Sequence, residues 1–158
     1  MGAYRQKRNF ETSTYDYIKA NMVSDWSSVN VYRGWGEVSG NNLPAVTVRS
    51  GVNVHGRVGV GSYATMREVT LFIDIFATGE GQGLDLTDYL VGLLKSSWDY
   101  KEYTVTAGVS SSTTDGKITC KSLTDVPVNL TTDKSELDKM DRYRYLLTII
   151  CVNNKVES

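Results

Sequence analysis

Three glycines lie between two apolar segments near the middle of the chain, where residues 79–83 have the sequence Gly-Glu-Gly-Gln-Gly. Glycines between a strand and a helix are typical of dinucleotide sites, where backbone N–H groups hold a pyrophosphate. Leu84 occupies the position at which that fingerprint needs a further glycine, and Asp85 and Asp88 add negative charge where a phosphate would bind. We therefore interpret the run as a strand-to-helix loop, with a nucleotide-binding enzyme as a distant alternative.

Other residue types that commonly carry catalysis or metals are sparse. His55 is the only histidine, and neither a glycine-flanked serine nor a paired base accompanies it. Cys120 and Cys151 lie far apart in apolar or strand-like surroundings, so we expect buried free thiols rather than a metal site or a disulfide. No zinc, P-loop or EF-hand spacing occurs. The sequence therefore predicts no catalytic site, no metal and no cofactor.

Positive and negative charges are nearly balanced over the 158 residues, with 17 Lys and Arg, 18 Asp and Glu and a formal net charge of -1. This balance argues against an overall basic field for binding nucleic acid or an anionic membrane. Arg49, Arg57, Arg142 and Arg144 form a candidate basic strip, although arginines on strands are usually solvated or paired with a neighbouring subunit's acids. Since no apolar run approaches the ~20 residues of a membrane span and no signal peptide begins the chain, we expect a soluble protein made in a cytoplasm.

The clearest structural signal covers residues 67–95. Aliphatic side chains alternate with other types over residues 69–75, which predicts a strand with one aliphatic face. After the glycines the period changes to that of a helix, with its apolar face formed by Leu86, Tyr89, Leu90, Leu93 and Leu94. Asp85 is placed to cap the start of this helix, and Lys95 puts a cation at its negative end. A sheet strand followed by its covering helix is the predicted unit.

Weaker patterns predict the remaining elements. In chain order these are a helix over about 12–24, strands over 29–35, 43–54, 100–109 and 118–123, a Ser/Thr-rich loop at 110–115, a surface excursion at 126–141 with a helical turn at 135–140, and a closing strand over 142–152. The closing strand is apolar on both faces, which is typical of an interior strand covered on both sides. We predict a single domain, 1–158, of the α+β class, with a mostly antiparallel sheet of about four to six strands and two helices packed on it.

Two segments look unlike the core of such a domain. Residues 1–11 are polar and basic, and we interpret them as an N-terminal arm. In residues 51–64, valines alternate with polar residues around Gly56, which predicts a long β-hairpin arm. Because this hairpin is rich in glycine, we expect it to be flexible in a monomer and to become ordered against another subunit.

The order of these elements resembles the tail terminator, or tail completion, proteins of long-tailed bacteriophages. Three short motifs carry the resemblance: the Leu-Pro-Ala-Val-Thr-Val strand at 43–48, the strand at 68–76, and the helix opening with Leu84 and Asp85. The resemblance covers most of the chain; it is weaker over residues 110–132, and the hairpin at 51–61 is not matched residue by residue.

The resemblance implies a structural protein of the virion neck, assembled in the host bacterial cytoplasm. It implies a homo-hexameric ring that caps the tail tube, ends its polymerisation and joins the tail to the head connector. Its partners would be the tail tube protein and the connector proteins, and genomic DNA would pass through the lumen without specific binding. Alternatives are another neck protein, either a head-tail adaptor or a stopper, and a stand-alone ligand-binding module.

Within that expectation, the two arms are the predicted contact elements. The predicted subunit or tail-tube interface residues are Arg5, Arg8, Phe10, Arg49, Val54, His55, Arg57 and Val58. An interface made by a flexible arm suits a chain with no catalytic constellation and with 10 tyrosines, a residue type enriched where proteins meet.

Overall fold

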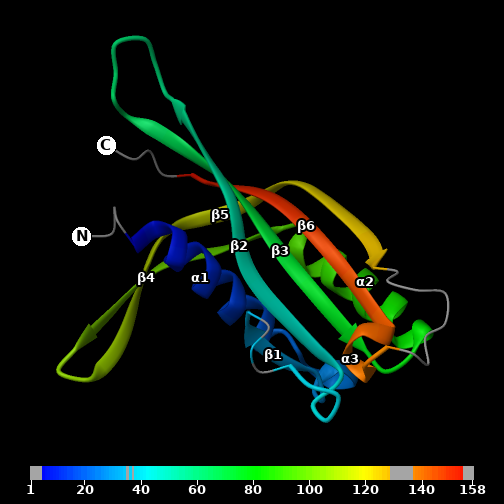
Figure 1. The fold of residues 1–158 in the computed structure, drawn as a ribbon. Coiled ribbons are helices and arrows are strands. Elements are labelled where there is room, and N and C mark those ends of the chain that lie inside the picture. The colour runs from blue at the N-terminus through cyan, green and yellow to red at the C-terminus, as the bar shows by residue number, and fades with distance from the viewer. Residues whose placement is uncertain (1–4, 35, 37, 129–136, 155–158) are drawn as a thin grey trace.

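A computed structural model describes residues 5–34, 36, 38–128 and 137–154 (Figure 1). Its elements are α1 (Gln6–Ala20), the 3-10 turn η2 (Ser24–Trp26), β1 (Asn30–Arg33), β2 (Ala45–Arg57), β3 (Thr65–Ala77), α2 (Glu80–Leu94), β4 (Ser97–Thr106), β5 (Val109–Val128), α3 (Lys139–Arg142) and β6 (Tyr143–Asn153). The six strands form one sheet in the order β1-β2-β3-β6-β5-β4. β1 and β2 run parallel, and the other neighbours are antiparallel. The predicted α+β class and mostly antiparallel sheet are confirmed.

The core lies between the sheet and the two long helices, on one face of the sheet. Leu71 and Ile73 of β3 pair with Ile149 and Leu147 of β6, and all four are fully buried. Burying such a side chain contributes about 1.5–3 kcal/mol relative to leaving it exposed. α2 lies over these strands and buries three leucines of the predicted apolar face: Leu86, Leu90 and Leu94. The predicted strand and its covering helix are therefore confirmed.

α1 packs beside α2 on the same face and contacts strands from both halves of the sheet. It lies against β4 at one edge and against β1 and β2 at the other. Strands that are distant in the sheet order meet the same helix because the sheet curls around it (Figure 1). Sheet twist produces such curling, and no long helix of the described residues covers the opposite face of the sheet.

The N-terminal arm predicted for residues 1–11 is wrong from residue 6 onward, because α1 begins at Gln6; residues 1–4 lie outside the described part. Phe10 is fully buried in the core and packs against Tyr100, with ring centroids 5.3 Å apart. The buried side of α1 also carries polar groups with distant partners. Asn9 donates a hydrogen bond to the Tyr100 hydroxyl at 3.3 Å, and Trp98 donates to the Thr14 hydroxyl at 3.1 Å. Because these buried residues are polar, the sequence pattern of a core-facing helix resembles that of an exposed segment.

α2 starts at Glu80, so the glycines at 79–83 belong mostly to the helix and the predicted loop is wrong there. Asp85 is exposed in the second turn and is not the cap, whereas Lys95 follows the last turn as predicted. The close approach of β6 explains the buried Gly83, since a Cβ at this position would lie 2.1 Å from Cε2 of Tyr145. This glycine therefore permits helix packing and does not form a phosphate loop.

The Ser/Thr-rich segment at 110–115, predicted as a loop, instead belongs to β5, which runs for 20 residues. The turn lies earlier, at Ala107 and Gly108, whose φ angles of 52° and 78° are typical of a type I′ hairpin. Side-chain hydroxyl groups also connect the exposed parts of β4 and β5, since the Thr104 and Ser111 side-chain oxygens lie 2.8 Å apart. β5 also takes in residues 126–128 of the predicted excursion, and the helical turn within the described residues is α3, which overlaps the predicted turn at 139–140. Residues 129–136 lie outside the described part.

β6 is an interior strand between β3 and β5, as predicted. On its helix-facing side every residue from Tyr145 to Asn153 is buried, whereas Leu146, Thr148 and Ile150 on the other side keep partial exposure. The expected cover on both faces is therefore wrong. Cys151 is buried and Cys120 half-buried, and both are free thiols on paired strands.

Candidate interaction surfaces

The β2–β3 hairpin extends beyond the sheet as an arm. β1 pairs with β2 only as far as Val48, and β6 reaches β3 only from Glu68 onward. Residues 54–67 are therefore held by two strands and the turn between them; we call this part the hairpin arm. Figure 1 shows it projecting away from both helices. The long hairpin predicted from the valine pattern is confirmed, while its flexibility stays a prediction.

A β-bulge sets the direction of the hairpin arm. The register of β2 against β3 shifts between Ser50 and Asn53. Gly51 lies at this shift under the ring of Phe72, and a Cβ there would come within 2.3 Å of that ring. Because a bulge bends its strand and increases the local twist, it turns the arm away from the sheet axis.

The hairpin arm exposes large apolar side chains and carries cations. Val54 and Val58 are 56% and 52% exposed, and Tyr63 in the turn is 88% exposed. Arg57, also exposed, lies over the Tyr63 ring with its guanidinium carbon 5.6 Å from the ring centroid. His55 pairs across the hairpin with Arg67. Exposed apolar groups with adjacent cations indicate a surface for contact with another protein.

The structure brings together four of the eight predicted interface residues. Val54, His55, Arg57 and Val58 lie on the hairpin arm. Arg5 and Arg8 are exposed at the start of α1, where they line a shallow groove with Arg33. Phe10 is wrong as an interface residue of the folded chain, because its side chain is completely buried in the core.

Arg49 belongs to an ion-pair cluster on the sheet face that lacks a long helix. Its Nε lies 3.2 Å from one carboxylate oxygen of Asp74, and a terminal nitrogen of Arg144 lies 3.0 Å from the other. The two guanidinium groups lie over the rings of Phe72 and Phe76, at 4.5 and 5.1 Å from the ring centroids. Asp74 itself is fully buried.

This cluster corrects the predicted basic strip. Arg49 and Arg144 converge on one carboxylate, Arg57 lies on the hairpin arm, and Arg142 donates to the Leu137 carbonyl at 3.0 Å. Two cations around one buried anion link β2, β3 and β6 through both carboxylate oxygens of Asp74. The sequence signal for it was an aspartate inside the apolar strand at 69–76, but its partners depend on strand pairing.

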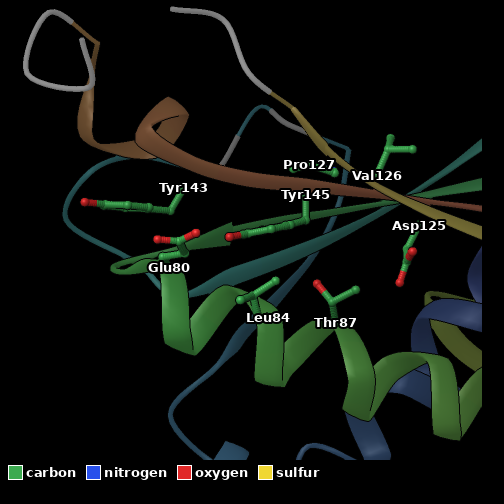
Figure 2. Close-up of a pocket in the computed structure, with 8 residues that line it drawn as sticks. All are labelled: Glu80, Leu84, Thr87, Asp125, Val126, Pro127, Tyr143 and Tyr145. Atoms are coloured by element: carbon green, nitrogen blue, oxygen red, sulfur yellow. The ribbon is translucent and has the colours of Figure 1, made fainter. Parts of the chain in front are cut away.

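A second surface, which sequence reasoning missed, is an acidic groove at the opposite end of the sheet (Figure 2). α2, β5 and β6 form it, with a volume of about 310 Å³, and its main residues are Glu80, Leu84, Asp125, Pro127, Tyr143 and Tyr145. Leu84 is 52% exposed in its floor, and Val126 at its rim is 45% exposed. The groove therefore combines apolar contact area with two carboxylates.

The electrostatics of the acidic groove favour a cation. Within the described part of the chain, neither Glu80 nor Asp125 is paired with a basic side chain. Burial, followed by the charge of Glu80 and then Tyr143, raises the pKa of the Tyr145 hydroxyl above its ordinary value, so this hydroxyl stays protonated. The groove residues come from three separated segments, and no local motif in the sequence joins them.

Across the described residues, no group of three or more His, Cys, Asp or Glu side chains is placed to hold a metal ion. No described helix is long and apolar enough to cross a membrane. No protein-family model and no curated protein sequence matches the chain.

Proposed function

We propose that this chain is a tail terminator of a long-tailed bacteriophage, which forms a homo-hexameric ring on the tail tube. The observation that carries the proposal is the hairpin arm, which projects from the sheet with exposed valines and a tyrosine. Burying apolar area contributes roughly 25 cal/mol per Å², so covering these side chains favours association. The arm therefore supports a role in contact between subunits or with the tube.

The fold supports this proposal over the other neck proteins. The resemblance leads us to expect helical bundles for adaptors and small β-barrels for stoppers. This chain instead forms a curled six-stranded sheet with its helices on one face. The motif strands at 43–48 and 68–76 are neighbours in that sheet, and the helix of the third motif covers the second of them.

A contact function also suits the chemistry of the described surface. Both carboxylate oxygens of Asp74 are contacted by arginines of the same chain, and the glycines at 79–83 form a helix start that packs against Tyr145. In the proposed ring, the hairpin arm meets a neighbour or the tube, the connector binds the opposite side, and DNA passes through the lumen. Strong, salt-sensitive DNA binding is not expected of this ring, since tight phosphate contacts would hinder passage.

A tube-growth assay tests the proposed function. Tail-tube protein encoded in the same genome is polymerised with and without this chain, and tube lengths are measured by negative-stain electron microscopy. We expect shorter tubes that carry a ring at one end and do not grow when more tube protein is added. Unchanged lengths with bare ends would contradict the proposal, and a titration with NAD and ATP would detect the enzyme alternative.

A further inference from the structure

The hairpin arm and the acidic groove lie at opposite ends of the same strand. β3 starts within the arm at Thr65 and ends at Ala77, three residues before Glu80 of the groove. Its 13 residues, at about 3.3 Å each, separate the two surfaces by ~40 Å. One molecule therefore cannot bring its own arm into its own groove, whereas a second copy can supply it.

The two surfaces have complementary chemistry. The arm offers the cation Arg57, and the groove offers the carboxylates of Glu80 and Asp125. The arm also exposes Val58, and the groove exposes Leu84; each is 52% exposed. At an interface, buried apolar area contributes affinity, and complementary charges fix the register in which the two surfaces meet.

Resting on the ring function proposed above, we propose that the hairpin arm of one subunit docks into the acidic groove of the next copy of this chain. The guanidinium of Arg57 enters the groove between the carboxylates of Glu80 and Asp125, which lie on either side of Leu84 (Figure 2), and Val58 covers Leu84. The contact is heterologous, because each subunit inserts its hairpin arm into one neighbour and binds the arm of the other neighbour in its acidic groove. When the rotation between neighbours is one sixth of a turn, repetition of this contact closes a six-membered ring in which every arm and every groove is covered.

Charge reversal tests the pairing of Arg57 with the groove. Arg57→Glu and the double variant Glu80→Lys with Asp125→Lys should each raise the dissociation constant of the ring by at least about 10-fold in sedimentation velocity, equivalent to ~1.4 kcal/mol. Combining all three changes should recover most of that loss. Matched controls are Lys7→Glu on α1 and Asp88→Lys on the exposed side of α2, which should leave the dissociation constant within about threefold.

Disulfide trapping tests the geometry independently. In a Cys120→Ser background, chains with both Val58→Cys and Leu84→Cys are oxidised and separated on denaturing gels. Head-to-tail docking predicts a ladder of linked chains that ends at six, whereas a 1:1 mixture of the two single variants should give only dimers. Linked dimers alone from the double variant would indicate a two-fold contact and overturn the inference.

The two experiments separate the inference from the function beneath it. If the wild type forms rings but charge reversal has no effect and no ladder appears, the docking inference is wrong and the proposed function stands. If the wild type forms no ring, alone or on tail tubes, both are wrong. If the control variants weaken the ring as much as Arg57→Glu, the effect is one of general charge and the specific pairing is overturned.

Discussion

Asp74 shows how one carboxylate organises a sheet face on which no long helix lies. It sits on β3 between Arg49 of β2 and Arg144 of β6, so its two oxygens link three neighbouring strands. The rings of Phe72 and Phe76 lie against the guanidinium groups of Arg49 and Arg144. Removing one member of a buried ion pair lowers the free energy of unfolding strongly, because the remaining charge is left buried without a partner.

Asp74→Ala should lower the free energy of unfolding by about 3 kcal/mol, because Arg144 is left with little exposure and without its buried carboxylate. Asp99→Ala is the matched control, as it breaks the exposed pair with Lys117 (3.3 Å). The control should change stability by at most about 1 kcal/mol. Urea denaturation measures both, and equal effects would contradict the role assigned to the cluster.

Cys151 gives the folded chain a predictable response to alkaline pH. Burial, followed by the nearby Cys120 and Glu68, raises the pKa of its thiol to about 12, and burial also raises the pKa values of Tyr100 and Tyr103. The unfolded chain releases these protons at lower pH, so it binds fewer protons than the folded chain in this range.

The free energy of unfolding should therefore be unaffected by these groups up to about pH 8.5 and should fall as the pH rises towards 12. Denaturation midpoints measured from about pH 7 to about pH 11 test this slope. Cys151→Ala should reduce the slope above about pH 9 by the share of one titrating group. A slope identical to that of the wild type would show that the thiol ionises freely in the folded chain.

At the scale of elements, α2 is positioned by a glycine contact. Gly83→Ala should destabilise the fold by about 1–3 kcal/mol, because the new Cβ would collide with the ring of Tyr145 in a packed interior. Gly81→Ala is the matched control in the same helix turn, since a Cβ added there would meet nothing within 4 Å. This control should raise the free energy of unfolding by roughly 0.5–1 kcal/mol, because alanine favours a helix more than glycine does. Thermal unfolding compares the pair. Equal effects of the two changes would contradict this packing argument.

Phe10 holds the first turns of α1 in the core. Phe10→Ala should lower the free energy of unfolding by about 3–5 kcal/mol, as expected for a fully buried aromatic side chain. Arg8→Ala, two residues away and exposed, should stay within about 0.5 kcal/mol of the wild type. If residues 6–11 were an arm apart from the core, both variants would unfold at the same denaturant concentration as the wild type.

Periodicity predicted the elements whose buried faces are aliphatic. β3, β6 and the body of α2 could be predicted because Leu, Ile and Val recur at strand or helix spacing. The first turns of α1 could not, since their buried side includes Asn9, whose partner Tyr100 lies 91 positions away in sequence. The acidic groove and the Asp74 cluster depend on which strands pair, and local sequence does not encode that choice.

In the whole molecule, the core, the ion-pair cluster and the two candidate contact surfaces occupy different parts of the sheet. One face holds the helices and the core, the other holds the ion-pair cluster, and the two ends of β3 lead to the hairpin arm and the acidic groove. A monomer with complementary surfaces at opposite ends is suited to head-to-tail assembly, which closes as a ring when the rotation between neighbours permits it. This arrangement connects the fold to the proposed function.

The most direct test of the ring is native mass spectrometry of the purified chain, combined with negative-stain images, over micromolar to millimolar concentrations and in the presence of tail tubes that lack a terminator. The proposal predicts a species of six chains with sixfold images, either free or at the tube end. A monomer or a two-fold dimer under every one of these conditions would contradict it.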